Sequence, residues 1–580
     1  MMMMSRPPIP KDESGYYHPK TEQEIVNIVK YAYDNDFQLR VRGSGHSIGP
    51  KIYTDVCTVD RVDVAACAPD GNNINIRLDE YIRILDVSGN RVTVEAGIHL
   101  GHEPNDKHST VENSLLYQLN NKHGLTVGDL GGINHQTVGG FLSTGSSGGS
   151  VKYGFSDNIH ALRMVDGTGQ IYTVSRDDAD QNHFRAALVS LGVLGVISTV
   201  TFDCVPSFNI SGSQLSAPSD QCQVDLYDDN PRKDGKIGLT SFLVDNDYAR
   251  ILWWPQTRGV VGLEKERLQV WHANRIPCDP YFKPTPYKLF DSAEIMIAYS
   301  YMMTILGNIN DMDAVRTIAA EKDKQFEKLM KAELEEKGID NIPATAISKV
   351  LKKVNEFILN VVTGTLDKIS VPIRETILPV LTTAAVTLLS TEVDSGCIKF
   401  QDYSWHGLPM DNSADDILIP TMWSEIWVPL QYATKATTML SEYFHASGKI
   451  SCTGNNAWEL YAAKPCEAWM SMSYSDGSDE WKYGAFRIDP YWFIDSNCDA
   501  RTFFRPVWLL LHNKNIPFRL HWAKLFPKMD DTDYDWRKIL IHSQYPHFRS
   551  FLDLRRSKDP KQIFLSSYWR YWLGIDLPKY

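Results

Sequence analysis

Val41-Arg42-Gly43-Ser44-Gly45-His46-Ser47 is a glycine-rich loop from which the rest of this chain can be interpreted. It follows residues 37–41, which are predicted to form a short strand. Its two glycines tolerate positive φ and let another group approach the backbone closely. Such a loop presents several N–H donors to a phosphate. A histidine in a glycine turn is more often structural or solvent-facing, so the loop alone assigns no role to His46.

The loop differs from two common nucleotide-binding motifs. Ile48 stands where the dinucleotide fingerprint requires a third glycine, and no Gly-Lys-Ser/Thr follows as in a Walker loop. The sequence therefore predicts a phosphate-binding loop of another kind.

Length and composition set the class of protein. A chain of 580 residues exceeds what one core supports, so two or more domains are expected. The formal net charge of -12 argues against a nucleic-acid-binding protein, which needs a basic face. The nine cysteines include no CxxC pair and are odd in number, which indicates reduced thiols and an intracellular setting.

No targeting or membrane segment is expected. The first 16 residues contain three prolines and lack the apolar run of a secretory signal. The longest apolar stretches, 295–309 and 376–390, fall short of the ~20 residues that span a bilayer. We therefore expect a soluble protein.

The N-terminal region has an irregular α+β pattern. Residues 21–24 form a capping box, and the helix that follows is expected to run to about residue 35. Short strands are predicted at 55–60, 74–78 and 91–97. This order is not a regular βαβ array.

A second glycine-rich run covers residues 130–149. A flexible linker is one interpretation. However, Ile133, Val138, Phe141 and Leu142 interrupt the run, and a glycine/serine linker lacks such anchors. We therefore expect a packed coil lining a phosphate-bearing cofactor. Strands at 157–165, 171–174 and 195–202, and a helix at 181–191, are expected to complete the domain before Pro206.

These motifs resemble those of the vanillyl-alcohol-oxidase-type (PCMH-type) FAD flavoproteins. Residues 42–47 match their Arg-Gly-x-Gly-His-Ser loop, while 124–140 and 191–197 look like segments of the aldonolactone oxidase and alditol oxidase branch. The resemblance implies a two-domain α+β fold and FAD joined covalently to His46. The residues it implies for FAD binding are Arg42, Gly43, Ser44, Gly45, His46, Ser47, Gly131, Thr137, Gly140, Ser143, Thr144, Gly145, Ser146, Gly148, Gly149, Tyr153, Val196 and Ile197.

Two departures from the family pattern affect the expected site. Ser147 stands where the family often has a histidine, so the local hydrogen bonding must differ. Residues 68–203 contain no cysteine, so a second, cysteinyl link to the flavin is not expected.

The middle of the chain is less informative. Helical periodicity over 311–337, 344–362 and 373–389 predicts a helical insertion at about 285–395. A contact with a partner protein or a membrane surface through this insertion stays open, although its charges are mixed.

The resemblance returns near the C-terminus. Glu425 takes the place of a substrate-binding glutamate of sugar oxidases, and Trp427 replaces an arginine that holds polyol hydroxyls in alditol oxidases. An aromatic there could stack on a sugar or lactone ring. His521 and Lys524 match the family's His-Trp-Gly-Lys motif, with Ala523 in place of glycine. On a regular strand His521 and Lys524 would point to opposite faces, so both reach one site only if the segment bends.

The expected function is oxidation of a primary or secondary alcohol of a sugar-derived substrate, with O₂ reduced to H₂O₂. The resemblance implies Glu425, His521 and Lys524 as catalytic residues and leaves the base unassigned. A dehydrogenase using a quinone, cytochrome or other acceptor is the alternative. A third interpretation is an inactive scaffold that binds a partner. Histidine spacing matches no zinc motif, so no metal is expected.

The expected domains are an FAD-binding domain at 16–206, a substrate domain at 207–540 and a C-terminal segment at 541–580 that returns to the FAD domain.

Overall fold

The structure is a computed structural model. It describes residues 7–59, 65–66, 73–229, 235–255, 266–287, 311, 313–314, 316–317, 397–412, 421–447, 455–493 and 499–575. The predicted helices over 311–337, 344–362 and 373–389 lie outside these residues, apart from a few positions near 313. The predicted role of the insertion in partner or membrane contact is therefore not addressed by the fold.

The glycine-rich loop begins where a small parallel sheet ends. Strand β2 (Gln38–Arg42) pairs in parallel with β5 (Asn73–Arg77), which pairs with β1 (Tyr16–Tyr17). Helix α1 (Glu22–Asp34) precedes β2 and has both halves of the predicted capping box, between Thr21 and Glu24. Its buried face packs beside β2, so this layer fixes the direction in which residues 43–47 leave the strand.

An antiparallel sheet forms the second layer of the N-terminal region. Its strand order is β10-β9-β11-β7-β6. The strands are β6 (Ile84–Ser88), β7 (Arg91–Glu95), β9 (Ile159–Val165), β10 (Ile171–Ser175) and β11 (Val196–Asp203). The helix predicted at 181–191 is shorter, α5 (Asn182–Ala187), and it could not extend to residue 191, because Leu191 adopts positive φ.

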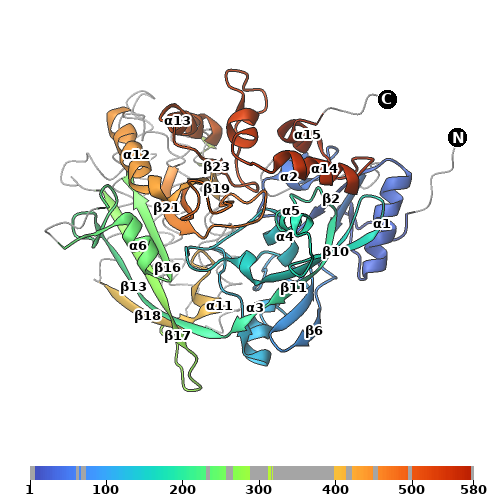
Figure 1. Cartoon of the computed structure of the whole chain (residues 1–580), viewed down its shortest axis with the longest axis horizontal. Helices are drawn as coiled ribbons and strands as arrows, with labels where there is room; N and C mark the ends of the chain where they lie inside the picture. Colours follow the sequence, from blue (N-terminus) through green and yellow to red (C-terminus); the bar gives the residue numbers. More distant parts are fainter. Residues whose placement is uncertain are drawn as a thin grey trace.

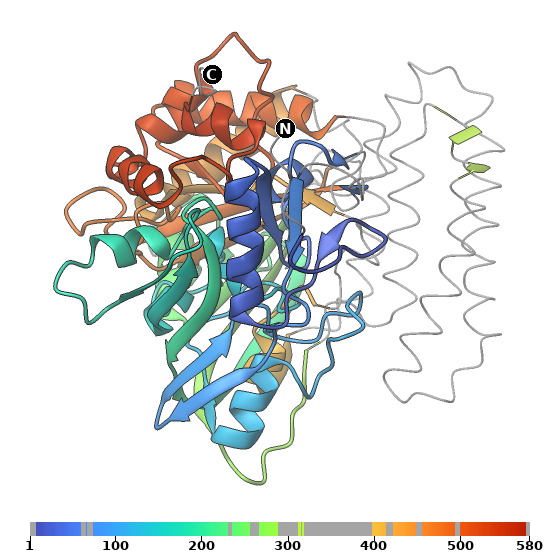
Figure 2. The same ribbon diagram turned by 90° about the vertical axis from the view of Figure 1, so that its right-hand side faces the viewer.

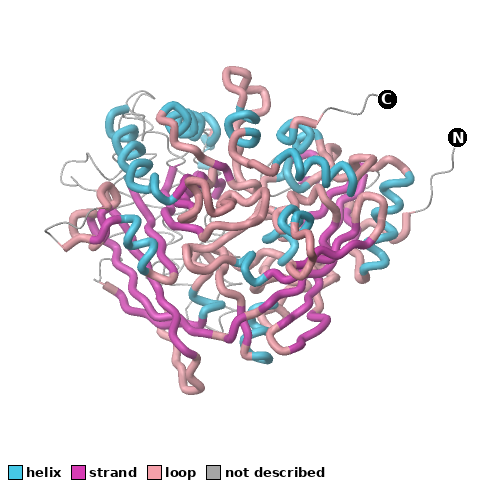
Figure 3. The backbone as a smooth tube through the Cα atoms, viewed as in Figure 1, coloured by secondary structure: helices cyan, strands magenta, loops and turns pink. Residues whose placement is uncertain are grey.

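A larger antiparallel sheet follows. Its order is β18-β13-β17-β16-β21-β22-β20-β23, with β19 paired to β22. The strands are β13 (Phe208–Pro218), β16 (Tyr248–Trp254), β17 (Arg267–Pro277), β18 (Ile398–Tyr403), β19 (Thr421–Trp423), β20 (Ile426–Pro429), β21 (Asn455–Ala463), β22 (Ala485–Phe493) and β23 (Arg519–Leu520). Figure 3 shows the two strand groups on opposite sides of the molecule with irregular coil between them.

Helices cover the outer side of the large sheet. Helix α12 (Ala433–Ser447) lies there beside α6 (Leu239–Asp245), and α13 (Ala500–Asn513) lies on the other side of α12 (Figure 1). Phe444 of α12 contacts Trp458 of β21 with ring centroids 5.0 Å apart, and Phe503 of α13 contacts Trp492 of β22 at 5.1 Å. These contacts leave the opposite side of β21 and β22 for the interior.

The C-terminal segment lies against the N-terminal layer. Helices α14 (Phe548–Lys558) and α15 (Ser567–Leu573) are close to α1 and β2 (Figures 1 and 2). The Leu39 N–H donates to the Ile563 carbonyl at 2.7 Å, and the Trp569 indole N–H donates to the Lys51 carbonyl at 2.9 Å. The predicted domain boundaries themselves stay a prediction.

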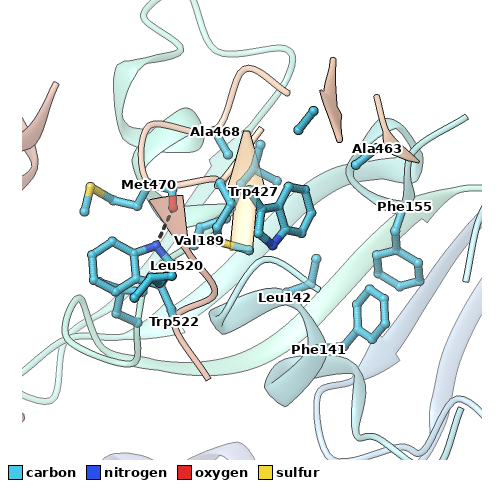
Figure 4. Packing of buried hydrophobic residues seen from close by; sticks show 14 of the residues in the cluster. Phe141, Leu142, Phe155, Val189, Trp427, Ala463, Ala468, Met470, Leu520 and Trp522 are labelled. Carbon is cyan, nitrogen blue, oxygen red and sulfur yellow. Dashed lines mark hydrogen bonds between the residues drawn. The ribbon is translucent and has the colours of Figure 1, made fainter. Parts of the chain in front are cut away.

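One continuous core joins the two strand groups. Figure 4 shows Phe141 and Phe155 from the N-terminal region in the same cluster of buried residues as Trp427 of β20 and Trp522, which follows β23. The Trp522 indole N–H donates to the Met470 carbonyl at 2.7 Å. The mixed helices and strands confirm the predicted α+β class.

Two chemical expectations can be compared with the described residues. Cys57 is disulfide-bonded, so the expectation of reduced thiols is wrong at that position. Among the helices that the structure describes, none is both long and apolar enough to cross a membrane.

Candidate active site

A cavity of about 210 Å³ lies between the two strand groups. The N-terminal region lines it with residues 40–47, with glycine-rich coil between 131 and 147, and with 191–197. The large sheet contributes residues of β16, β19, β21 and β22, together with the turn at 521–524. The two predicted groups of site residues, of which one ends at Ile197 and the other begins at Glu425, therefore meet in one cavity.

Close packing of glycines shapes the wall on the N-terminal side. A Cβ on Gly43 would lie 2.6 Å from Thr137 Oγ1, and Gly45 has φ +96. Thr137 caps helix α4 (Val138–Ser143) by accepting a hydrogen bond from the Gly140 N–H at 3.2 Å. The second glycine run is therefore a packed coil and helix, not a flexible linker.

Most residues predicted to bind the cofactor line this cavity. They are Arg42, Gly43, Ser44, Gly45, His46, Ser47, Gly131, Thr137, Gly140, Ser143, Thr144, Ser146, Val196 and Ile197.

The other four, Gly145, Gly148, Gly149 and Tyr153, are not among the lining residues. The Gly148 N–H donates to Asp129, the Gly149 carbonyl accepts from the Ala249 N–H, and Arg275 lies over the Tyr153 ring. Gly148, Gly149 and Tyr153 therefore contact segments next to the cavity and not the cavity itself.

Glu425 lies at the start of β20 and is buried, so it is not a surface carboxylate. Its Oε1 accepts one hydrogen bond from Arg487 Nη2 at 2.6 Å and another from the Trp427 indole N–H at 2.9 Å. Burial alone would raise the pKa of Glu425, but the charge and hydrogen bond of Arg487, together with the charge of Lys524, lower it below its usual value. The carboxylate is therefore ionised at neutral pH.

The structure contradicts the predicted substrate contact of Trp427. Its side chain has no exposed surface, and it is not among the residues that line the cavity. The indole lies beneath the Arg487 guanidinium, with 4.5 Å between the ring centroid and Cζ. Strand alternation places Trp427 on the same face as Glu425, but Arg487 covers it. No ring of a substrate can stack there.

His521 and Lys524 reach the same cavity because the chain bends after Leu520, where β23 ends. The Lys524 N–H donates to the His521 carbonyl at 3.0 Å, which closes a turn, and Trp522 points into the core. Burial lowers the pKa of His521 to about 3, so this imidazole is neutral at physiological pH.

The Lys524 ammonium faces the glycine-rich loop. Its Nζ donates to the His46 carbonyl at 3.4 Å and lies 4.2 Å from the centroid of the Trp423 ring. Lys524 is therefore not an exposed lysine after a buried tryptophan. It is a cation that connects the C-terminal motif to the first motif of the sequence.

Sequence reasoning missed a buried charge cluster at the large-sheet end of the cavity. Arg250 Nη1 lies 2.7 Å from Asp411 Oδ1 and 3.2 Å from Glu459 Oε1. The Tyr461 hydroxyl donates to Asp489 Oδ2 at 2.5 Å. These residues belong to no contiguous motif. The one signal of these residues in the sequence is that polar side chains occupy alternate positions along β16, β21 and β22.

The described residues contain no group of three His, Cys, Asp or Glu side chains placed to hold a metal ion.

Two family models match the chain in separate regions. A model described as FAD binding domain matches residues 14–103 and 108–175. A model described as D-arabinono-1,4-lactone oxidase matches residues 313–572. The first includes the glycine-rich loop, and the second includes Glu425, His521 and Lys524.

Two relatives show the same similarity. L-gulonolactone oxidase from Mus musculus is 30% identical over 263 residues, which are 45% of this chain and 49% of that protein. D-arabinono-1,4-lactone oxidase from Saccharomyces cerevisiae is 27% identical over 266 residues, 45% of this chain and 41% of that protein. The chain thus spans about half the length of these relatives, or less.

A solved structure confirms the fold. A cholesterol oxidase from Brevibacterium sterolicum superposes with a TM-score of 0.61 at 14% identity, over 96% of this chain and 93% of that one. At this identity the likeness concerns the fold alone. Together with the two family models, it confirms the predicted resemblance of the chain to the vanillyl-alcohol-oxidase-type (PCMH-type) FAD flavoproteins.

Proposed function

We propose that this protein is an FAD-dependent oxidase that oxidises an alcohol group of a sugar-derived lactone and passes the electrons to O₂. One observation carries the proposal. The glycine-rich loop with His46 and the group of Glu425, His521 and Lys524 line the same cavity. The names of the related lactone oxidases support the substrate class and favour an oxidase over the dehydrogenase and scaffold alternatives.

FAD is the cofactor that the FAD binding domain identifies. The part of the cavity lined by residues 43–47 fits FAD. Gly43, Gly45 and Gly140 expose their backbone there, at positions where any side chain would clash or be strained. These glycines would hold the phosphates, and His46 would form the covalent link to the flavin. The bound flavin would supply the hydride acceptor, while the protein supplies orientation and charge.

Lys524 would supply the positive charge. An ammonium preorganised in a water-poor site stabilises negative charge that develops during the reaction. Its distance from the His46 carbonyl places it beside the loop expected to hold the flavin. Flavin reduction creates such a charge, so the proposed role of Lys524 is stabilisation of the reduced, anionic state.

The hydrogen bonds favour Glu425 as the proton acceptor. Both donors, Arg487 and Trp427, bind Oε1, so Oε2 is the oxygen left for a substrate hydroxyl. His521 Nδ1 accepts the Ala523 N–H at 3.1 Å, which places the imidazole proton on Nε2. His521 would therefore donate a hydrogen bond to the substrate and not remove its proton.

The buried charge cluster fits a neutral, hydroxyl-rich substrate. Asp411, Glu459 and Asp489 line the cavity and offer oxygens to hydroxyl donors. Among the described residues, Asp489 Oδ1 is buried without a hydrogen-bond partner. An anionic substrate would meet the ionised carboxylate of Glu425, so we propose a lactone or another neutral sugar derivative.

The first prediction concerns the covalent link. We expect His46→Ala to abolish covalent attachment of FAD, because the imidazole supplies the bonding nitrogen. Acid precipitation followed by flavin fluorescence of the pellet and the supernatant measures the linked fraction. His123→Ala, at an exposed histidine, is the control and should keep the flavin in the pellet. Flavin that stays in the pellet of His46→Ala would contradict the link.

The second prediction concerns Lys524. A hydrogen bond to a charged group is worth roughly 1.5–3 kcal/mol, and about 1.4 kcal/mol is a tenfold change in rate. We therefore expect Lys524→Met to slow flavin reduction about 10- to 100-fold while FAD stays bound. Anaerobic stopped-flow mixing with an accepted substrate measures this rate. Lys528→Met, at a half-exposed lysine in the same segment, should change it less than about threefold. An equally small effect of Lys524→Met would remove Lys524 from the active site.

The third prediction concerns pH. Burial, together with the charge of Asp411, raises the pKa of Glu459 to about 7. The protonated acid therefore stabilises the fold fully below about pH 4.5, and this contribution is lost as the pH rises through about 7. Glu459→Gln mimics the protonated acid.

We expect the free energy of unfolding of the wild type, relative to Glu459→Gln, to fall by roughly 1–3 kcal/mol over that range. Denaturant titrations at a series of pH values provide the test. The exposed Glu442→Gln should show no such trend. Parallel pH curves for the wild type and Glu459→Gln would show that Glu459 is ionised throughout.

A further inference from the structure

A buried carboxylate contacts His46 from outside the main cavity. Glu103 is 4% exposed, and its Oε2 lies 3.6 Å from His46 Nε2. Its Oε1 accepts a hydrogen bond from the Asn105 N–H at 2.9 Å, and its backbone N–H donates to Ser109 Oγ at 2.9 Å. The carboxylate is therefore fixed by its own loop and does not depend on a ligand for its position.

The loop at 42–44 separates Glu103 from the main cavity. A second cavity of about 70 Å³ lies behind that loop and is lined by Glu103, His99 and Asp106. Arg42, Gly43 and Ser44 line both cavities, whereas Glu103 is not among the residues lining the larger one. Glu103 is thus placed to act on the histidine and not on a substrate.

The charge of Glu103 is suited to this contact. Burial alone would raise its pKa, but the His46 imidazole 3.6 Å away and the hydrogen bond from the Asn105 N–H lower the pKa to about 2. At neutral pH an ionised carboxylate therefore faces Nε2. An ionised carboxylate only accepts hydrogen bonds, so it favours the imidazole form with a proton on Nε2.

We propose that Glu103 is a positioning residue for covalent attachment of the flavin. This inference rests on the proposed link through His46. Glu103 holds the proton on Nε2, which leaves Nδ1 as the nitrogen with a lone pair for the new bond. It also stabilises the positive charge that the ring gains when Nδ1 forms the bond.

The attachment reaction joins His46 to the flavin and leaves the flavin reduced. Nδ1 forms a bond to the carbon of the flavin 8α-methyl group, one C–H of that methyl breaks, and the imidazole loses its N–H proton. The flavin keeps the two electrons and two protons and is thereby reduced. Dioxygen then takes them and becomes hydrogen peroxide, which restores the oxidised flavin.

The test uses Glu103→Gln in the full-length protein, with Asp106→Asn as the matched control. Asp106 is also a buried acid of the small cavity, but its Oδ2 lies 3.8 Å from Arg77 and 3.9 Å from His99, not beside His46. The protein is produced under riboflavin limitation, and FAD is then added. At set times the protein is precipitated with acid, and the fraction of FAD that stays in the pellet is measured. It does not depend on turnover.

We expect Glu103→Gln to bind FAD but to attach it at least about tenfold more slowly than the wild type, because the neutral amide no longer presents a negative charge to the His46 ring. Asp106→Asn should match the wild type. Equal rates for Glu103→Gln and the wild type would overturn the proposal while leaving the His46 link intact. A wild type without covalent flavin would instead refute the link itself.

A second measurement covers the case in which Glu103→Gln does not fold. The flavin peptide from a digest of the wild-type protein can be analysed by NMR to identify the linked nitrogen. The proposal requires Nδ1. A bond to Nε2, the nitrogen that faces Glu103, would overturn it.

Discussion

The buried guanidinium of Arg487 is the interaction on which the geometry of the cavity depends. It binds Glu425 through Nη2, and through Nη1 it donates to the carbonyls of Ser147 and Gly148 at 2.8 and 3.0 Å. One side chain of the large sheet thereby connects the carboxylate of β20 to the second glycine run. Breaking a buried pair by removing one partner typically costs about 3–5 kcal/mol, because the other charge is left uncompensated. The position of Glu425 is therefore coupled to the position of the second glycine-rich run, through Arg487.

The sequence could predict those parts of the site that lie in contiguous motifs. Residues 42–47 are constrained by backbone geometry that only certain residues allow, and this constraint is visible in a single sequence. His521 and Lys524 were also identified, although the bend that unites them depends on where β23 ends. Arg487, Arg250 and Glu459 were missed because they meet only through strand pairing between distant segments. The Trp427 contact was wrong for the same reason: alternation assigns a face, but the cross-strand partner decides whether that face is covered.

Several buried acids line the cavity, and their pKa values are shifted in different directions. Burial raises the pKa of Asp489 well above its usual value and raises that of Asp411 as well, whereas Arg487 keeps Glu425 ionised. Neighbouring buried acids thus have pKa values shifted in opposite directions, because the nearby cations outweigh the cost of burial at Glu425 but not at Asp411 or Asp489. Glu103, on the other side of the glycine-rich loop, is a further ionised acid. The loop therefore separates a carboxylate that faces His46 from one available to a substrate.

We propose that one cavity holds the flavin between His46 and the group formed by Glu425, His521 and Lys524. A crystal structure of the purified holoprotein would show where the flavin lies. We expect continuous density between the His46 ring and the flavin, at a single C–N bond length of about 1.45 Å. We also expect the Lys524 ammonium and the Glu425 carboxylate to face the flavin ring system. A flavin bound elsewhere, or one whose reactive ring is separated from Lys524 and Glu425 by the core, would refute the proposed site.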